Sequence, residues 1–376
     1  MSGFLFETAP RIVCQDGAAA RLSEHLPPRG AGPVLVVTDP GLVAAGVIGP
    51  VVEALKADGL DVRVWDAVEA DPPEAVVERT VAFAREIESS LVIGLGGGSA
   101  MDTAKLVALL ARSGERLQAV YGVGLARGPR LPLVQVPTTA GTGSEVTPIA
   151  IVTTPTDEKK GVVAPVLYPD VAVLDATLTL GLPPAVTAAT GVDAMVHAIE
   201  AYTSRHKKNP VSDALALKAL DLLWRGIRPA VADGRDLEAR RAMLQGALLA
   251  GMAFANAPVA AVHALAYPLG GRFHVPHGLS NALVLAPVLR FNRPAAEGLY
   301  EELGRSLGLR GAGGLIHGVE RLLAVLPMPR TLREVGVGEG DLDALAADAM
   351  NVQRLLVNNP REVTLTDARA IYAEVL

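Results

Sequence analysis

Short runs of β-branched residues alternate with helical patterns in the first half of the chain, and these runs stop near Pro183. They cover residues 34–39, 61–65, 91–98 and 133–139, and helical periodicity follows each of the first three. Alternating strands and helices build a mainly parallel sheet with helices on both faces, which binds ligands at the carboxyl ends of its strands. The pattern predicts a doubly wound α/β domain over residues 1–182.

Beyond Pro183 the strand signals vanish, and Ala, Leu, Arg and Glu dominate long helical stretches punctuated by Gly and Pro. The segment Gly181-Leu182-Pro183-Pro184 marks the change. A chain of 376 residues, half of them hydrophobic, is long enough for two substantial cores. The second domain is therefore predicted to be all-α and to span residues 183–376.

Composition excludes several classes of protein. A net charge of −6, scattered Lys and Arg, and only six Tyr, six Phe and two Trp argue against nucleic-acid binding. Cys14 is the only cysteine, so no intrachain disulfide can form, which indicates a reducing, cytoplasmic setting. The start MSGFLFETAPRIV has no cationic region before a long apolar core and does not resemble a signal peptide.

The segment from Ala242 to Gly271 contains no Asp, Glu, Lys or Arg and is long enough for a membrane span. It also holds polar residues, two prolines, and many Ala and Gly residues. These features favour closely packed buried helices that break at the prolines. We therefore expect no membrane partner.

Four residues in the second domain have the chemistry of a metal site. Asp193 and His197 are four positions apart in a helical segment, so both side chains would project from one face. His263 lies in an apolar helical run, and His277 follows in VPHG, where the flanking proline and glycine suggest a tight turn. Three imidazoles and a carboxylate suit a first-row divalent metal, whereas hydrogen-bonded core histidines are the alternative.

A run of three glycines, Gly96 to Gly98, follows a buried strand and precedes a helix that Ser99 is expected to cap. Glycines let backbone amides approach a phosphate, and the helix N-terminus adds a favourable dipole. The run lacks the spacing of the usual dinucleotide fingerprint, so a plain turn remains an alternative. A second loop, VPTTAGTGSEVT, offers hydroxyls beside glycines at another strand end, namely Thr138, Thr139, Thr142 and Ser144.

Asp39 ends the first clear strand. A carboxylate at that place can accept hydrogen bonds from the adenosine ribose and would repel a 2′-phosphate, which predicts NAD rather than NADP. An ordinary surface-loop aspartate is the alternative reading.

The chain resembles the iron-containing, or group III, alcohol dehydrogenases, which share a fold with glycerol dehydrogenase and dehydroquinate synthase. The resemblance covers nearly the whole chain and is most specific in GGGSAMDTAK, PTTAGTGSEVT, GVDAMVHAIEAYTS and VHALAYPLGGRFHVPHGLSNALVLAPVLRFN. It implies a dinucleotide-binding domain before a helical domain. It also implies a homodimer or an assembly of dimers.

The resemblance assigns roles to particular positions. Its metal ligands, for Fe²⁺ or Zn²⁺, fall on Asp193, His197, His263 and His277, the four residues reached above. Its NAD contacts fall on Asp39, Gly97, Gly98, Ser99, Thr138, Thr139, Thr142 and Lys160.

Two positions depart from the family pattern. Tyr267 stands where many members have a second histidine four residues after the third ligand, and we expect it to act mainly by positioning and steric contact. Asp71 stands where relatives usually have an asparagine, which places a negative charge near the expected cofactor site.

The predicted activity is hydride transfer between NAD(H) and a small alcohol or aldehyde at a divalent metal. Enzymes resembling maleylacetate reductase or lactaldehyde reductase are alternatives within the same superfamily. An NAD-using lyase would need more Lys and Arg near the metal than these motifs contain. A non-catalytic nucleotide-binding protein would leave the metal ligands unexplained.

Overall fold

The computed structural model describes residues 3–156 and 158–376. The chain divides into two compact units. One is Thr8–Leu180, and the other is Gly181–Leu376 together with the N-terminal segment that ends at Glu7. Glu7 joins the helical unit because its backbone N–H and C=O both hydrogen bond to the Asn256 side chain, each at 2.8 Å.

The first unit contains a six-stranded sheet in which every neighbouring pair is parallel. In spatial order the strands are β1 (Ile12–Cys14), β9 (Val171–Leu174), β6 (Leu133–Pro137), β4 (Leu91–Gly96), β2 (Val34–Val37) and β3 (Val62–Trp65). All four strands expected from the sequence are confirmed. Three of them end two residues earlier than predicted. Their predicted last residues, Asp39, Gly98 and Thr139, lie in the loops and helix starts that follow the strands.

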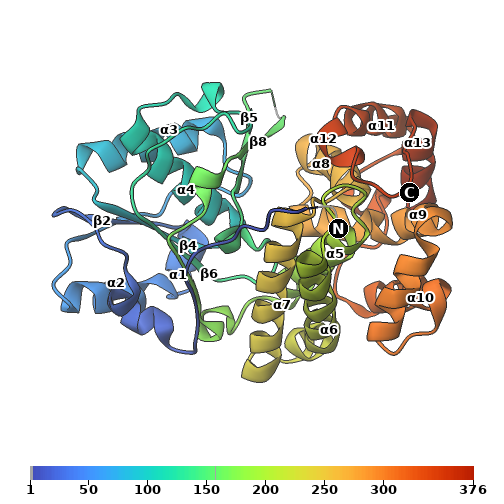
Figure 1. Cartoon of the computed structure of the whole chain (residues 1–376), viewed down its shortest axis with the longest axis horizontal. Helices are drawn as coiled ribbons and strands as arrows, with labels where there is room; N and C mark the ends of the chain where they lie inside the picture. The colour runs from blue at the N-terminus through green and yellow to red at the C-terminus, as the bar shows by residue number, and fades with distance from the viewer. Residues whose placement is uncertain (1–2, 157) are drawn as a thin grey trace. The chain divides into compact units, whose positions relative to one another are not determined.

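Alternate residues of the central strands pack against different helices. Leu35 and Val37 belong to a core with α3 (Glu74–Glu86) and α4 (Gly98–Ser113), whereas Val34 and Val36 belong to one with α2 (Ile48–Ala57). Figure 1 shows α3 and α4 on one side of these strands and α2 on the other. Helices on both faces confirm the doubly wound architecture.

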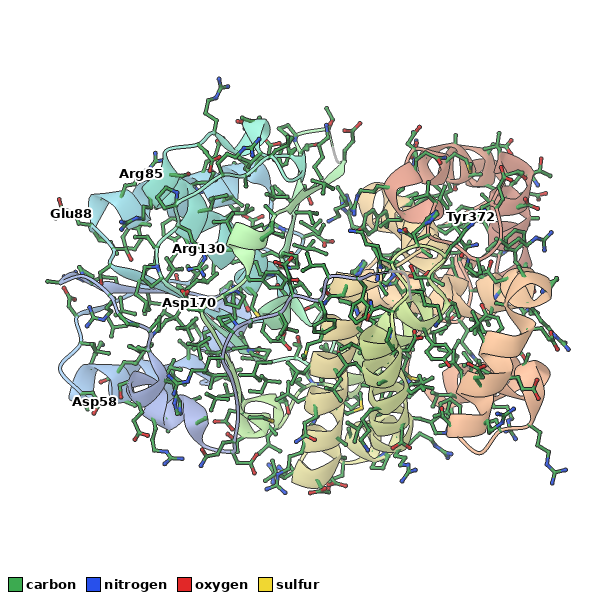
Figure 2. All side chains as sticks on the ribbon, viewed as in Figure 1. Asp58, Arg85, Glu88, Arg130, Asp170 and Tyr372 are labelled. Atoms are coloured by element: carbon green, nitrogen blue, oxygen red, sulfur yellow. The ribbon has the colours of Figure 1, made fainter. Side chains whose placement is uncertain are left out.

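A second, three-stranded sheet in this unit has the order β5 (Gly122–Val123), β8 (Lys159–Val163) and β7 (Ile149–Thr153). The antiparallel pair of β7 and β8 was absent from the sequence prediction. In the main sheet, Arg130 and Asp170 form an ion pair at 2.6 Å, and Asp170 also accepts the Leu133 N–H at 2.7 Å (Figure 2). These contacts fix the start of β6 beside the segment that leads into β9.

Residues 181–376, all of which the structure describes, contain helices and no strand, as the sequence predicts. The helices are α5 (Pro184–Thr203), α6 (Pro210–Ala232), α7 (Leu237–Asn256), α8 (Ala261–Phe273), α9 (His277–Ser306), α10 (Gly311–Val325), α11 (Leu342–Met350), α12 (Gln353–Leu356) and α13 (Leu365–Glu374). The buried Tyr372 of α13 donates its hydroxyl to the Leu265 carbonyl of α8 at 2.6 Å (Figure 2). This bond anchors the middle of α8.

Short 3₁₀ helices complete both units. They are Ala18–His25, Leu117–Ala119, Ser144–Val146, Pro165–Leu167 and Ala176–Thr179 in the first unit, and Arg333–Val335 and Glu339–Asp341 in the second. Within the residues that the structure describes, no single helix has the length and apolar character needed to cross a membrane. The helices α7 and α8 meet that criterion only as a pair, which is bent by 105°.

Candidate metal centre and cofactor loops

The helix α5 presents Asp193 and His197 on one buried face. They are 2% and 4% exposed, and His197 Nε2 lies 3.9 Å from Asp193 Oδ1. The ring of Phe254, from α7, stacks on the imidazole of His197 with 4.3 Å between ring centroids. The sequence expectation of a pair on one helical face is confirmed, and Phe254 holds the imidazole in its plane.

The helices α8 and α9 contribute the other two histidines. His263 lies in the first turn of α8, and His277 is the first residue of α9. The expected tight turn at His277 is therefore wrong: the turn precedes it, where His274 adopts a left-handed conformation with φ 52°. At Gly278, an added Cβ would lie 2.4 Å from the Ala189 carbonyl oxygen, so only glycine lets α9 start this close to α5.

The four side chains converge on one point. The Nε2 atoms of His263 and His277 lie 3.8 and 3.6 Å from Asp193 Oδ1. All four ligand atoms lie within 4.8 Å of one another. Donors bound at about 2.1 Å around a tetrahedral ion would lie about 3.4 Å apart, so this cluster needs only a small contraction to hold one. The donor set fits a first-row divalent cation.

The surroundings of Asp193 lower the pKa of its carboxyl group. Burial alone would raise the pKa of Asp193. The nearby imidazoles and the hydrogen bond from Asn281 outweigh burial and lower the pKa below its usual value. The carboxylate is thus held ionised, which is the form that binds a metal.

Asn281 is a site residue that the sequence analysis missed. It is fully buried, and its Nδ2 donates to Asp193 Oδ1 at 2.6 Å and lies 3.3 Å from Nε2 of both His263 and His277. Its Oδ1 is buried without a hydrogen-bond partner. The signal was present in HGLSN, because a residue four positions after His277 on a helix shares its face. Asn281 holds the orientation of the Asp193 carboxylate.

Tyr267 lies one turn after His263 on α8, and its ring centroid is 6.1 Å from that of His277. Its hydroxyl accepts a hydrogen bond from Arg354 Nη2 at 3.3 Å, and the guanidinium lies 5.8 Å from the centre of the ring. Arg354, on α12, places a positive charge against Tyr267, which the motifs alone did not indicate.

The glycine run joins β4 to α4 as predicted, but the N-cap of α4 is not the predicted residue. Gly97 is the N-cap, and Ser99 lies inside the helix, so the expected capping by Ser99 is wrong. Its hydroxyl instead accepts the backbone N–H of Asp71 at 3.1 Å. The carboxylate of Asp71 pairs with Lys159 at 2.9 Å, which offsets the negative charge that departs from the family pattern.

The two predicted cofactor loops are in contact. A Cβ added at Gly98 would lie 2.7 Å from Thr142 Cγ2, and one added at Gly97 would lie 3.6 Å from Thr139 Oγ1. The loops after β4 and β6 therefore form one surface at the carboxyl ends of adjacent strands, where parallel sheets bind ligands.

The remaining cofactor candidates differ in accessibility. Asp39 is partly exposed and caps the short helix α1 (Pro40–Ala44) by accepting the Leu42 N–H at 3.0 Å. Lys160 is exposed on β8 and pairs with Glu158 at 3.2 Å. Thr138 is fully buried, and its hydroxyl has no hydrogen-bond partner.

A buried charged cluster lies beneath these loops. The fully buried Nζ of Lys105 on α4 donates to the hydroxyls of Ser144 at 2.8 Å and Thr147 at 3.1 Å, and to the Ile149 carbonyl at 2.7 Å. Asp102 accepts from the Ser144 hydroxyl at 2.6 Å and from the Ile151 N–H at 2.9 Å. Burial lowers the pKa of Lys105 to about 8. The cluster ties α4 to the second loop, through Ser144 and Thr147, and to β7, which follows that loop.

The structure has the features of proteins that bind both a nucleotide and a divalent metal. One unit has a doubly wound sheet with glycine loops at its strand ends, and the helical unit has a buried Asp-His₃ cluster. Family models described as iron-containing alcohol dehydrogenase and as the C-terminal part of that family match residues 9–176 and 187–376. The chain belongs to the iron-containing alcohol dehydrogenase family.

Individual relatives agree with this placement. The chain is 42% identical over 367 residues to long-chain-alcohol dehydrogenase 1 of Geobacillus thermodenitrificans, covering 95% of this chain and 92% of that protein. A crystal structure of 1,3-propanediol oxidoreductase, 34% identical, superposes with a TM-score of 0.94 and full coverage of both chains. Sulfoacetaldehyde reductase from Bifidobacterium kashiwanohense, solved in complex with NAD⁺, is 28% identical with a TM-score of 0.89, covering 100% of this chain and 99% of that one.

Proposed function

We propose that this protein is a metal-dependent alcohol dehydrogenase or aldehyde reductase that transfers a hydride between NAD(H) and a small alcohol or aldehyde. The observation that carries the proposal is the convergence of Asp193, His197, His263 and His277 within 4.8 Å. Family membership supports the reaction type, and the NAD⁺ complex of a similar reductase supports the cofactor. The metal is Fe²⁺ or Zn²⁺, since the donor set accepts both.

We also propose the roles of the two parts of the chain: residues 1–182 bind the dinucleotide, and residues 183–376 bind the metal. The proposed NAD contacts are those of the sequence analysis, Asp39, Gly97, Gly98, Ser99, Thr138, Thr139, Thr142 and Lys160. The contact between the glycine run and the Thr139–Thr142 loop supports them. A homodimer, or an assembly of dimers, in the cytoplasm completes the proposal and can be checked by light scattering of the purified protein.

Each group of residues has a definable task in this reaction. When bound, the metal polarises the substrate oxygen and the nicotinamide accepts or donates the hydride. The carboxylate of Asp193 offsets the charge of the cation, and Asn281 fixes the direction of that carboxylate. The backbone amides at the start of α4, just after the N-cap Gly97, would bind the pyrophosphate.

One assay separates this function from its alternatives. Absorbance of NADH is followed with a panel of aldehydes and alcohols, after reconstitution with Fe²⁺ or with Zn²⁺. We expect turnover that a chelator abolishes and the metal restores. Binding of NADH without turnover of any substrate would favour a non-catalytic nucleotide-binding protein, and conversion without net change in NADH would favour a lyase.

The position of Arg354 favours a second substrate class, aldehydes that carry an anionic group. Its guanidinium lies against Tyr267, whose ring centroid is 6.1 Å from that of the ligand His277, and can pair with a carboxylate or sulfonate. Sulfoacetaldehyde reductase, named above, is a similar structure whose name contains such a substrate. The panel should therefore contain a sulfonated and a carboxylated aldehyde beside aliphatic ones of equal length.

Asp39→Gly should narrow the preference for NAD over NADP. The carboxylate is held at the end of β2 by the Leu42 N–H, where it would repel a 2′-phosphate and accept from ribose hydroxyls. The test compares kcat/KM for both cofactors in the two proteins. A wild type that prefers NADP, or a ratio that the substitution leaves unchanged, would remove Asp39 from the cofactor site.

Tyr267→Phe should keep most of the activity and lose less than about tenfold, because a true general acid or base contributes roughly 100-fold or more. The variant retains the ring beside His277 and removes only the hydroxyl that Arg354 contacts. Steady-state rates across pH provide the measurement. A larger loss, together with the disappearance of one limb of the pH profile, would show that Tyr267 transfers the proton.

A further inference from the structure

The proposed reaction gives no role to Glu200, whose buried carboxylate contacts three polar groups. Glu200 lies on α5, one turn after His197, and is 4% exposed. Its Oε2 contacts His263 Nδ1 at 2.6 Å and accepts the Ala260 N–H at 2.9 Å, while Oε1 accepts the Val262 N–H at 2.7 Å. Both oxygens are thus engaged at the start of α8.

The start of α8 explains why an acid is needed there. The N-cap residue Ala260 has no side chain that could cap the helix. The first N–H groups of a helix lack acceptors within it, and the helix dipole favours a negative charge at this end. Glu200, on α5, supplies both the hydrogen-bond acceptor and the negative charge. This contact fixes the position of α8 relative to the helix that carries Asp193 and His197.

The same carboxylate determines which nitrogen of His263 carries the proton. Both oxygens of Glu200 already accept backbone N–H groups, from Ala260 and Val262, so the carboxyl group acts as the acceptor in the 2.6 Å contact and the imidazole donates through Nδ1. The lone pair then lies on Nε2, the atom that is 3.8 Å from Asp193 Oδ1 within the ligand cluster. The other tautomer would point an N–H toward the cation position and could not bind a metal.

We propose that Glu200 is a positioning residue that selects the metal-binding tautomer of His263 and caps α8 at the same time. The carboxylate of Glu200 therefore stabilises the start of α8 and also sets the tautomer of His263, the metal ligand on that helix. The proposal rests on the metal site of the proposed function, but the tautomer can be measured without a metal, so the two can fail separately.

The first test is made on the wild-type chain without metal. Histidine is labelled with ¹⁵N, and ring nitrogen shifts are assigned to His263 by comparison with His263→Gln. The spectra are recorded at an alkaline pH, where imidazole rings are neutral, and we expect the proton on Nδ1. A neutral ring with the proton on Nε2 would overturn the proposal, even if every substitution at position 200 prevented folding.

The second test is Glu200→Gln, which keeps the size and one acceptor but offers an amide N–H₂ group to the imidazole. The variant should shift His263 toward the Nε2 proton and weaken Zn²⁺ binding, measured by competition with a chromophoric chelator, by about 10- to 100-fold. Glu302→Gln is the matched control. This acid contacts the Tyr202 hydroxyl rather than a ligand histidine, so its loss should leave Zn²⁺ affinity unchanged.

The outcomes of the second test are distinct. Reduced thermal stability with an unchanged tautomer and unchanged Zn²⁺ affinity would show that Glu200 only caps α8, and the proposal would fail. If the wild type bound no divalent metal at all, the proposed function would fail instead, while the ring nitrogen shifts would still decide what Glu200 does.

Discussion

His263→Ala and His277→Ala are expected to lose bound metal and to lower kcat/KM by more than about a thousandfold. Each substitution removes one of four converging donors, which exposes the cation and loosens its geometry. A metal that polarises a substrate oxygen contributes several kcal/mol to the transition state, and ~4 kcal/mol corresponds to about a thousandfold in rate. Metal content by mass spectrometry and steady-state rates provide the measurement.

His317→Ala is the control for this pair. His317 lies on α10, with a side chain that is 67% exposed and a contact to Glu320. Its removal should change neither metal content nor rate. If His263→Ala or His277→Ala kept full metal occupancy and a near-normal rate, that histidine would have to be removed from the proposed ligand set.

Lys105→Met should lower the free energy of unfolding by about 3–5 kcal/mol, the range typical when one partner is removed from a buried charged group. The substitution keeps the length of the side chain but removes the donor to Ser144, Thr147 and Ile149. Glu145, which is also buried and whose pKa burial raises to about 7, would lose its neighbouring cation. Urea unfolding at neutral pH gives the stability, and fluorescence titration with NADH gives the affinity of the folded fraction.

Lys56→Met provides the comparison, because Lys56 is half-exposed and its ion-pair partner Glu53 is exposed. Such a pair contributes less than about 1 kcal/mol. Ser144→Ala, a milder change, removes the hydroxyl that connects Lys105 to Asp102 and should destabilise by an intermediate amount. Equal unfolding midpoints for Lys105→Met and Lys56→Met would mean that the buried cluster does not stabilise the loops.

The sequence predicted the layers of the fold because their signals are local. A run such as VLVV, flanked by turn residues, forms a buried strand whether or not its neighbours are known. The spacing of Asp193 and His197 likewise determines that both share a face of any helix that contains them. The antiparallel β7 and β8 were missed, because neither sequence alternates apolar and polar residues: β7 reads IAIVT, and β8 reads KKGVV.

The N-cap of α4 and the first residue of α9 were mispredicted, because they depend on contacts between residues far apart in the sequence. Serine is a favoured N-cap residue, yet the Ser99 hydroxyl accepts the N–H of Asp71 from 28 residues away. The cap of α4 is Gly97, two residues before the predicted one. His277 was expected in a turn because it stands between proline and glycine. Proline precedes helices as readily as turns, and the close approach of Gly278 to α5 decides the outcome.

By itself, the sequence determined the alternation of strands and helices, the change to helices near Pro183 and the types of residue that could bind a metal, because each depends on neighbours within a few positions. The resemblance implied that Asp193, His197, His263 and His277 share one metal site, but only the tertiary structure gave their distances. It alone decided that Asn281 and Glu200 orient these ligands and that Arg354 lies beside Tyr267. Glu200 and His263 are 63 residues apart, and no periodicity relates them. Their pairing arises where the start of α8 meets Glu200 of α5, because a buried carboxylate needs hydrogen-bond donors and a helix start needs an acceptor.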